Sequence, residues 1–540
     1  MPLPDYAGPW PPEPHDVAAD AYNEFTAWWA GNTDDLAEIY SRSTAFAPVR
    51  PSQLMGGVRG FASRLWWGRP VLPDTNRLHV PAAADIATTS ADLLFGQPPS
   101  WLFSEGDATD IEGAQTRLNE LMDGADTVAT FLEGAETQAA LGGVYFRLHW
   151  DQAIAQKVML SAVAPDAAIP HWRYGHLTAV TFWRVVGKDK RGTWRHLEHH
   201  EPGRIEHALY CGDDGSIGRR MPLEEMTATQ WAAELVDEES SIRTGIDGMT
   251  ACYVPNVRPA RRWRSIPELA PLGRSDFEGL EHLFDALDEA WSSWMRDLDL
   301  GKGRLFVAQN LLEDQGPGKG ATFDREREIF TAAPADDMGL NDEGSLRLVQ
   351  ANQFLIRVEE HAQTCEKILK QILRGAGYSA ADFDDSDSTA MTATEVSARS
   401  NKSNQTRNRK ILYWQSEVPE LALSALALDR VVFGGPDFGI KRAPEMVFPV
   451  RVDQDPVQLS TAIANLKLAK AVSTETAVRM FHPNWSNLEV EEEVARITSE
   501  TEAELKAQQT FLDPPSDFTD GDPANDDQDQ DGTDPFAKAA

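Results

Sequence analysis

Cysteine, long apolar runs and signal-like segments are scarce or missing in this sequence. Its 540 residues include 3 cysteines, Cys211, Cys252 and Cys365, which lie far apart and have no metal-ligand spacing. This pattern favours a reducing compartment over a disulfide framework. No run approaches the ~18 apolar residues of a membrane span, and the Pro-rich residues 1–16 lack a signal-peptide pattern. We therefore expect a protein made in a cytoplasm and without a membrane partner.

Motifs of nucleotide-dependent and hydrolytic enzymes are also missing. The segment GPGKG at 316–320 lacks the leading glycine and the Ser or Thr after lysine that a P-loop needs. There is no Gly-x-Ser-x-Gly elbow and no HExxH motif. Asp527, Asp529 and Asp531 copy the first half of a calcium loop, but Lys538 stands where that loop needs a bidentate glutamate. The sequence therefore favours a protein that is not an enzyme and carries neither metal nor cofactor.

Positive charge is in the minority. The chain has 50 Lys and Arg against 85 Asp and Glu, a formal net charge of −35. Such a surface does not grip nucleic acid by counterion release, although DNA can still slide past it. Residues 507–540 have the composition of a disordered acidic tail.

The patterns that are present predict an α+β protein. Residues 17–42 have a helical pattern, and 108–140 indicate a pair of helices. From about 141 to 265, alternating runs such as GGVYFRLHW and TWRHLEHH, separated by turn signals, indicate a meander of antiparallel strands. Residues 456–506 indicate three helices. The last of these carries Glu489, Glu491, Glu492 and Glu493 against Arg496, the wrong sign for a DNA-reading helix.

Two long helices stand out by a 3.5-residue apolar period. The first opens at a capping box of Ser275 and Glu278, and the second ends at Gly375–Gly377. Long helices with this period pack side by side, and residues 301–350 form a small insert between them. The predicted packing residues are Phe284, Leu287, Trp291, Trp294, Val358, Cys365, Ile368 and Ile372.

A basic helix follows the second of these helices. Thr392 and Glu395 form a capping box, and the next dozen residues hold no large apolar side chain. Because a polar helix has no core of its own, we expect it to line a wet channel or to meet an adjoining subunit. Pro419 should kink or divide its apolar continuation. The cations expected at the channel or subunit contact are Arg399, Lys402, Arg407, Arg409 and Lys410.

A histidine-rich segment offers a competing metal interpretation. On a strand, His196, Glu198 and His200 share one face, and His199 and His207 lie nearby in the sequence. The alternative, which we favour, is a half-exposed strand pair joined by the turn at 201–203. The segment leaves open a metal-dependent hydrolase as a second function.

The order of these parts resembles the portal proteins of tailed bacteriophages, the ring that forms the DNA gateway of the head. The resemblance spans about residues 20–505. It rests on stretches such as RLHVPAAADIATTSADLLFGQPP, GRSDFEGLEHLFDALDEAW, FLIRVEEHAQTCEKILKQILRGAGYS and TATEVSARSNKSNQTRNRKILYW.

The resemblance implies an elongated subunit whose parts have family names. By position these are a β-rich wing at 17–274, stem helices at 275–300 and 351–377, and a clip at 301–350. A tunnel loop at 378–390, a kinked tunnel helix at 391–433, a return to the wing at 434–455 and a helical crown at 456–506 follow. In such a fold Asp382, Asp384, Asp385 and Asp387 are expected in a mobile loop at the bore.

The resemblance also implies partners. These are further copies of the chain in a ring, expected to be a dodecamer, the large terminase subunit, a head-tail adaptor, the major capsid and scaffolding proteins, and double-stranded DNA in the channel. The expected location is the portal vertex of the virion, with host cytoplasm as the place of assembly. Besides the metal-dependent hydrolase, an assembly scaffold that acts through the acidic tail remains a third possible function.

Overall fold

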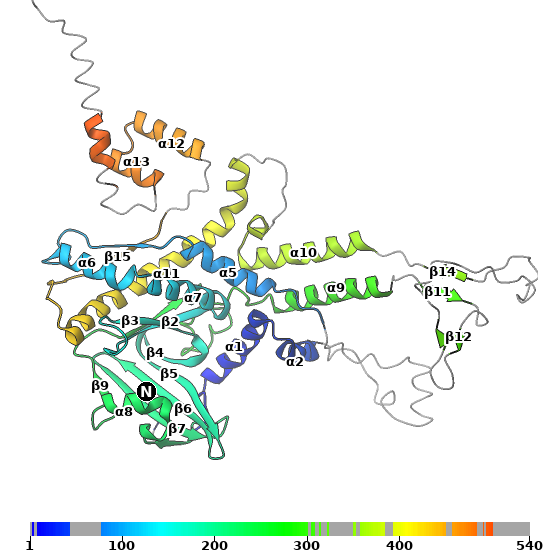
Figure 1. Cartoon of the computed structure of the whole chain (residues 1–540), viewed down its shortest axis with the longest axis horizontal. Helices are drawn as coiled ribbons and strands as arrows, with labels where there is room; N and C mark the ends of the chain where they lie inside the picture. Colours follow the sequence, from blue (N-terminus) through cyan, green and yellow to red (C-terminus); the bar gives the residue numbers. More distant parts are fainter. Residues whose placement is uncertain are drawn as a thin grey trace, which may run out of the picture. The chain divides into compact units, whose positions relative to one another are not determined.

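The computed structural model describes residues 3–4, 8–43, 77–300, 357–383, 393–449, 456–482, 490 and 493–500, with four short strands between 304 and 352. The chain divides into two compact units, Met1–Asp453 and Gln454–Ala540. The first unit mixes helices with antiparallel sheets, which confirms the α+β class (Figure 1). None of the described helices combines the length and the apolar character that a membrane span needs.

The N-terminal helices end where glycine permits a left-handed backbone. α1 (His15–Ala30) stops at Gly31, with φ of 64°, and α2 (Thr33–Ser43) follows, so the helical segment predicted at 17–42 is broken there. α5 (Ala82–Phe95) comes next. The predicted pair at 108–140 is confirmed as α6 (Ile111–Met122) and α7 (Ala125–Leu141).

A three-stranded antiparallel sheet lies at the centre of the first unit. Its order is β10 (Ala251–Pro255), β2 (Gly143–His149), β3 (Met159–Val163), and α7 and α11 contact it. Alternate residues of β2 serve opposite faces: Val144 and Phe146 join one hydrophobic core, and Tyr145 joins another. Both faces of this strand are therefore covered, which explains its nearly continuous apolar sequence.

The larger sheet is also antiparallel. Its path runs β4 (Ala168–Arg173), β5 (His176–Asp189), β6 (Gly192–Glu201), β7 (Arg204–Gly212), β8 (Arg219–Met221), and β9 (Ser241–Arg243) pairs with β7. η2 (Pro165–Ala167) precedes it, and η3 (Leu223–Glu225), η4 (Thr227–Thr229) and α8 (Gln230–Leu235) lie between β8 and β9. The strands predicted between 141 and 265 thus belong to two sheets, not to one meander.

The two long helices with an apolar period are α9 (Glu281–Leu300) and α10 (Val358–Ala376), which pack side by side (Figure 1). Trp294 stacks on His361, and Leu280 lies beside Gly375, so the helices run in opposite directions. The predicted capping box is wrong. Gly279 has a φ of 84° and α9 starts after it, while the Ser275 hydroxyl donates to the Ala140 carbonyl oxygen at 2.5 Å.

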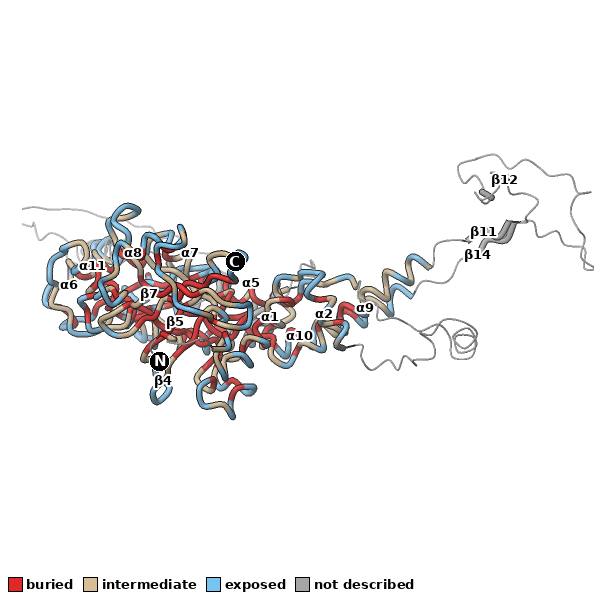
Figure 2. Tube along the Cα trace, turned by 90° about the horizontal axis from the view of Figure 1, so that it is seen from below, coloured by how far each residue is buried: buried red, intermediate tan, exposed pale blue. Residues whose placement is uncertain are grey.

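Burial decreases along α9. Figure 2 shows buried residues concentrated in the sheets and in the first turns of α9, with intermediate and exposed residues towards its C-terminal end. Phe284 and Leu287 are buried, whereas residues from Ala290 to Asp299 are intermediate or exposed. Among the described residues, the outer half of α9 therefore contributes little to a core of its own subunit.

The remaining elements complete the first unit. After α10 come η7 (Ala380–Phe383) and the long helix α11 (Ala393–Phe433). β15 (Glu445–Val447) then pairs with β1 (Ser100–Leu102). In the insert between α9 and α10, β11 (Arg304–Val307) pairs with β14 (Val349–Asn352), and β12 (Glu313–Asp314) pairs with β13 (Ala321–Thr322).

The second unit contains α12 (Pro456–Leu468) and α13 (Thr474–Phe481), and residues 493–500 are also helical. The Ser473 hydroxyl caps α13 by accepting from the Thr476 amide at 3.1 Å. These three helical segments all lie within 456–506, the range over which three helices were predicted. The calcium-like run Asp527–Asp531 and the acidic tail lie outside the described residues.

Candidate functional site

The polar half of α11 is anchored in the interior of its own subunit. Ser403, Arg407, Lys410 and Trp414 follow one another at intervals of four, three and four residues and are 1%, 7%, 1% and 0% exposed. This spacing places them on one helix face. The buried stripe continues into the apolar half of the helix at Val418, which is 1% exposed. The helix therefore has a polar interior face that the sequence analysis did not anticipate.

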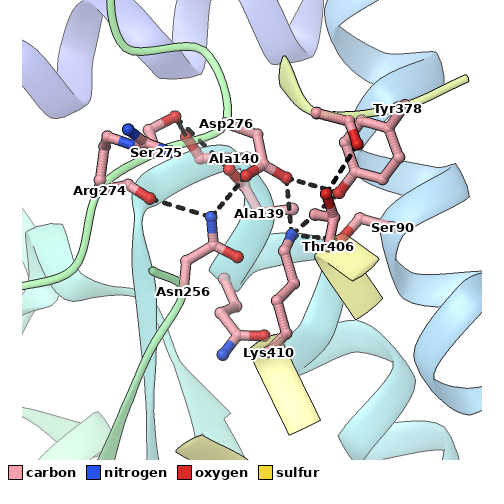
Figure 3. A network of polar contacts seen from close by, with 12 residues as sticks. Ser90, Ala139, Ala140, Asn256, Arg274, Ser275, Asp276, Tyr378, Thr406 and Lys410 are labelled. Atoms are coloured by element: carbon pink, nitrogen blue, oxygen red, sulfur yellow. Dashed lines mark hydrogen bonds and ion pairs between the residues drawn. The ribbon is translucent and has the colours of Figure 1, made fainter. Parts of the chain in front are cut away.

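Lys410 is the centre of a buried network of hydrogen bonds (Figure 3). Its ammonium group donates to Asp276 Oδ2 at 2.6 Å, to the Ser90 hydroxyl at 2.6 Å and to the Tyr378 hydroxyl at 3.0 Å. An ammonium group has three N–H donors, so each of them has a partner. A buried lysine can stay charged under these conditions because its desolvation is offset by the carboxylate and two hydroxyls.

The carboxylate of Asp276 ties further segments to the same point. Its Oδ2 also accepts from the Tyr378 hydroxyl at 2.8 Å, and its Oδ1 accepts from Asn256 Nδ2 at 2.7 Å. We call Ser90, Asn256, Asp276, Tyr378 and Lys410 the buried polar network. It joins α5, the end of β10, the segment before α9, the end of α10, and α11 in one cluster (Figure 3).

Burial and neighbouring charges shift the pKa values of two members of the network, Lys410 and Tyr378. Burial lowers the pKa of Lys410, and the attraction of Asp276 opposes this shift only in part. Burial raises the pKa of Tyr378, as does the neighbouring Asp276. Removing one member of a buried ion pair typically costs about 3–5 kcal/mol because the other charge remains unpaired. We infer that the network fixes the base of α9 and α10 against α11.

Arg407 makes a second anchor, one turn before Lys410. Its Nε donates to the Leu93 carbonyl oxygen at 2.6 Å, and its Nη2 donates to the Pro449 carbonyl oxygen at 3.0 Å. Leu93 lies in the last turn of α5, where carbonyl groups have no partner within the helix. Arg407 therefore holds the C-terminal end of α5 to α11.

These positions correct part of the prediction for the basic helix. Arg407 and Lys410 are buried in their own chain, so they do not face a channel or an adjoining subunit. Lys402 and Arg409 are exposed, and the Lys402 ammonium group donates to the Arg374 carbonyl oxygen. Arg399 lies in α11, but its side chain is outside the described residues.

Predictions were also made for Pro419 and for the aspartate-rich loop before α11. Pro419 lies inside α11, which continues past it as a single helix and is not divided. Asp382 lies in η7, and its side chain is outside the described set. Asp384, Asp385 and Asp387 also fall outside the described residues, so their position at a bore stays a prediction.

The predicted packing residues of the two long helices do not all share one environment. Val358 is 48% exposed because it is the first residue of α10, so its predicted packing role is wrong within the subunit. The structure buries Phe284, Leu287, Cys365 and Ile372 in one core, with Trp291, Trp294 and Ile368 partly buried against it.

A second buried carboxylate lies on α9. Asp288 is 1% exposed and accepts from the Tyr40 hydroxyl at 2.7 Å and from the Val80 amide at 2.8 Å. His79 Nδ1 lies 2.9 Å from the same carboxylate. Sequence reasoning missed this residue. Its signal was an aspartate on the apolar face of a helix, next to Leu287.

The histidine-rich segment forms hydrogen-bonded pairs. His196 Nε2 lies 3.2 Å from His207 Nδ1, and the two rings stack on adjacent strands. His200 lies between Glu198, at 2.8 Å, and Thr250, at 2.7 Å. Burial lowers the pKa of His196 to about 3 and that of His207 to about 4, so both rings are neutral at pH 7. Within the described residues, no group of three or more His, Cys, Asp or Glu has an arrangement that could hold a metal ion.

Comparison with known proteins decides the family. A family model described as "Phage portal protein, SPP1 Gp6-like" matches residues 73–507. The chain belongs to this family of phage portal proteins. The matched range includes α5, both sheets, the α9–α10 pair, α11 and every member of the buried polar network.

Two further comparisons, with solved structures and with curated protein sequences, give no additional support for a function. One solved chain, from a structure titled "Neck of native GTA particle computed with C12 symmetry", is 12% identical, with 83% of this chain and 98% of that chain covered. Its TM-score is 0.33, and we draw no conclusion from a similarity at that level. No curated protein sequence matches significantly.

Proposed function

We propose that this chain is one subunit of a ring-shaped channel at a single capsid vertex, through which double-stranded DNA is packaged and later ejected. The observation that carries the proposal is membership of the portal family over residues 73–507. The role is structural and not enzymatic. The histidine segment gives no support to the competing hydrolase, because its rings are buried and paired with one another and with Glu198 and Thr250.

The proposed parts follow the order of elements. We assign the wing to residues 17–274, the stem to α9 and α10 within 275–300 and 351–377, and the clip to 301–350. The tunnel loop corresponds to 378–390, the tunnel helix to α11 within 391–433, the return to the wing to 434–455, and the crown to 456–506. The Pro-rich residues 1–16 and the acidic tail at 507–540 lie outside these parts.

Two features of the described helices support a ring. Trp291 and Trp294 are only partly covered by their own subunit, and Val358 is exposed, so the outer half of the pair leaves apolar surface for a neighbour. At the other end, the buried polar network fixes the same pair to the body. A helix pair that is anchored at its base, and whose described residues become less buried towards its tip, suits a wall assembled from several copies.

The proposed partners are other copies of the chain, with twelve as the expected number, and DNA in the bore. We further propose that the large terminase subunit and later a head-tail adaptor dock on the clip. The major capsid and scaffolding proteins would meet the ring at the capsid vertex. Assembly in host cytoplasm, with the virion as the final location, follows from this role.

Negative-stain microscopy of the purified full-length protein tests the proposal. We expect rings with a central hole, and the same rings from a variant that lacks residues 512–540. A stable, compact monomer at working concentration, measured by light scattering, would refute the portal ring. Loss of rings on deletion of the tail would instead favour a scaffold that acts through its acidic segment.

A further inference from the structure

The turn between β4 and β5 presents an aromatic side chain to solvent. It consists of Arg173, Tyr174, Gly175 and His176, all of which are exposed, and we call these four residues the β4–β5 tip. Tyr174 is 97% exposed. Among the large apolar and aromatic side chains that the structure describes, none is more exposed than this one.

The backbone of Tyr174 is also unusual. Its φ is 53° and that of Gly175 is 82°, so both central residues of the turn are left-handed, as in a type I′ hairpin turn. This conformation favours asparagine, aspartate or glycine at the first position and is an outlier for a bulky side chain. The chain thus keeps a tyrosine where the isolated subunit gives it no support. A contact that buries the ring would offset the strain of the backbone.

A second exposed apolar surface lies on α8, which packs on β6 and β7 (Figure 1). Trp231 and Leu235 are 45% and 55% exposed, and they lie four residues apart on one side of the helix. The other exposed residues of α8 are Gln230 and Glu234. We call these four residues the α8 surface.

The ring of Trp231 is held in place by its own subunit. It packs edge-on against the rings of His196 and His207, at 6.2 and 5.6 Å between centroids. Its indole N–H donates to the Ala228 carbonyl oxygen at 3.0 Å. Because the ring is already oriented, a second aromatic ring can dock on its exposed part at a small cost in side-chain entropy.

The charges of the α8 surface and of the tip are opposite. Residues 221–242 contain six carboxylates and no Lys or Arg. Glu225 is paired with Arg191, but Glu234 has no ion-pair partner within the described residues. In the same part of the chain Arg173 of the tip also lacks an ion-pair partner. A cation next to an exposed aromatic ring therefore matches an acidic segment with an exposed aromatic ring at its centre.

The tip and the α8 surface of one subunit are too far apart to meet. In the pairing of β5 with β6, Arg184 lies opposite His196, the residue against which Trp231 packs. Gly175 precedes Arg184 by nine residues, which is about 30 Å at the rise of a β-strand. A contact between these surfaces therefore has to join two copies of the chain.

We propose that the β4–β5 tip of one copy docks on the α8 surface of the next copy, with Tyr174 against Trp231 and Arg173 facing the carboxylates. The contact uses a different surface on each copy, so it repeats head to tail and can close into a ring. Tyrosine, tryptophan and arginine are also the residue types that carry most of the energy of protein interfaces. This inference rests on the proposed ring and identifies one contact that builds it.

Cross-linking tests the pairing directly. A variant with Tyr174→Cys and Leu235→Cys is treated with a short bis-maleimide at a concentration where negative-stain images show rings, and denaturing gels report covalent oligomers. The two new cysteines of one chain are about 30 Å apart, so a short linker joins them only between copies. We expect a ladder of bands up to the full ring. Each single variant, and a control with Ile154→Cys and Leu235→Cys, should give no ladder; Ile154 is also exposed but lies on another turn.

A second measurement tests the contribution of the tyrosine ring. Asparagine suits the left-handed backbone, so Tyr174→Asn should not impair folding of the subunit. It removes the ring, and we expect ring assembly, followed by light scattering, to need about tenfold more protein. Ile154→Asn is the matched control and should stay within about twofold of wild type.

The outcomes separate this inference from the proposed function. If wild-type protein forms no rings, the proposed portal function itself fails. If rings form but the Tyr174→Cys/Leu235→Cys variant gives no ladder, the pairing of the tip with α8 is wrong while the ring stands, even where Tyr174→Asn weakens assembly. A ladder from this variant alone, together with weaker assembly of Tyr174→Asn, supports both proposals.

Discussion

Replacing Lys410 with methionine tests the buried polar network most directly. The substitution keeps a long unbranched side chain and helix propensity but removes the ammonium group that donates to Asp276, Ser90 and Tyr378. The carboxylate of Asp276 would remain buried with two neutral donors, the Tyr378 hydroxyl and the Asn256 amide.

The expected cost is about 3–5 kcal/mol in the free energy of unfolding, because a buried charge loses its counter-charge. Arg409→Met is the matched control on the same helix. Arg409 is exposed and has no carboxylate partner in the described part of the chain, so its loss should change stability by less than about 0.5 kcal/mol. A double variant, Lys410→Met with Asp276→Asn, should recover part of the loss, since it leaves no unpaired charge.

Urea unfolding followed by tryptophan fluorescence is a suitable assay. Trp414, one of the 16 tryptophans, is fully buried one turn from Lys410, and its indole N–H donates to Gln138 at 3.0 Å, so it contributes to the emission change on unfolding. If Lys410→Met unfolds at the same urea concentration as Arg409→Met, the network does not hold α9, α10 and α11 together, and our account of the polar stripe is wrong.

Three other substitutions or conditions test separate features. Asp288→Ala leaves the Val80 amide and the Tyr40 hydroxyl without their acceptor and should cost about 3 kcal/mol or more in urea unfolding, whereas the half-exposed Glu289→Ala should cost little. Gly377→Ala forces a Cβ onto a residue with φ of 98° and to within 2.8 Å of the Thr406 hydroxyl, so a loss of about 1 kcal/mol or more is expected; Gly435→Ala, with no atom nearer than 3.8 Å, is its control. Folding keeps His196 and His207 neutral, so their contribution is complete above their unfolded pKa of about 6.5 and declines as the pH falls towards their folded values. The loss between pH 7.5 and pH 5 should be about 2 kcal/mol for each ring, and an His196→Asn/His207→Asn variant whose pH dependence is unchanged would contradict this assignment.

The sequence predicted the elements that depend on local pattern. The runs at β2, β5, β6 and β7 have the composition of strands bounded by turns, and α9 and α10 show a long apolar period; all of them are present. What the sequence could not provide was the division of the strands into two sheets. That division depends on which strands pair, and β10 pairs with β2 across more than 100 residues of chain.

The buried polar network was missed for a different physical reason. A segment without large apolar side chains was taken to have no interior face, but polar groups can be buried when their hydrogen bonds are all satisfied. The signal was present in the sequence. The intervals that connect Trp414 with Val418 continue backwards through Lys410, Arg407 and Ser403, so the buried face of the apolar half extends into the polar half.

The basic helix has buried cations, Arg407 and Lys410, and exposed ones, Lys402 and Arg409, so the two groups have to be tested separately. Reversing Arg399, Lys402, Arg407 and Arg409 together would place a carboxylate at Arg407, where the side chain now donates to the Leu93 and Pro449 carbonyl oxygens. A lost ring or lost packaging would then follow from misfolding alone, because a buried acid would face two acceptors. Among the cations of this helix whose side chains the structure describes, only the exposed Lys402 and Arg409 can report on a channel or a partner, and only if Arg407 and Lys410 are left in place. The same helix thus uses one face to hold the subunit together and leaves the other available to its surroundings.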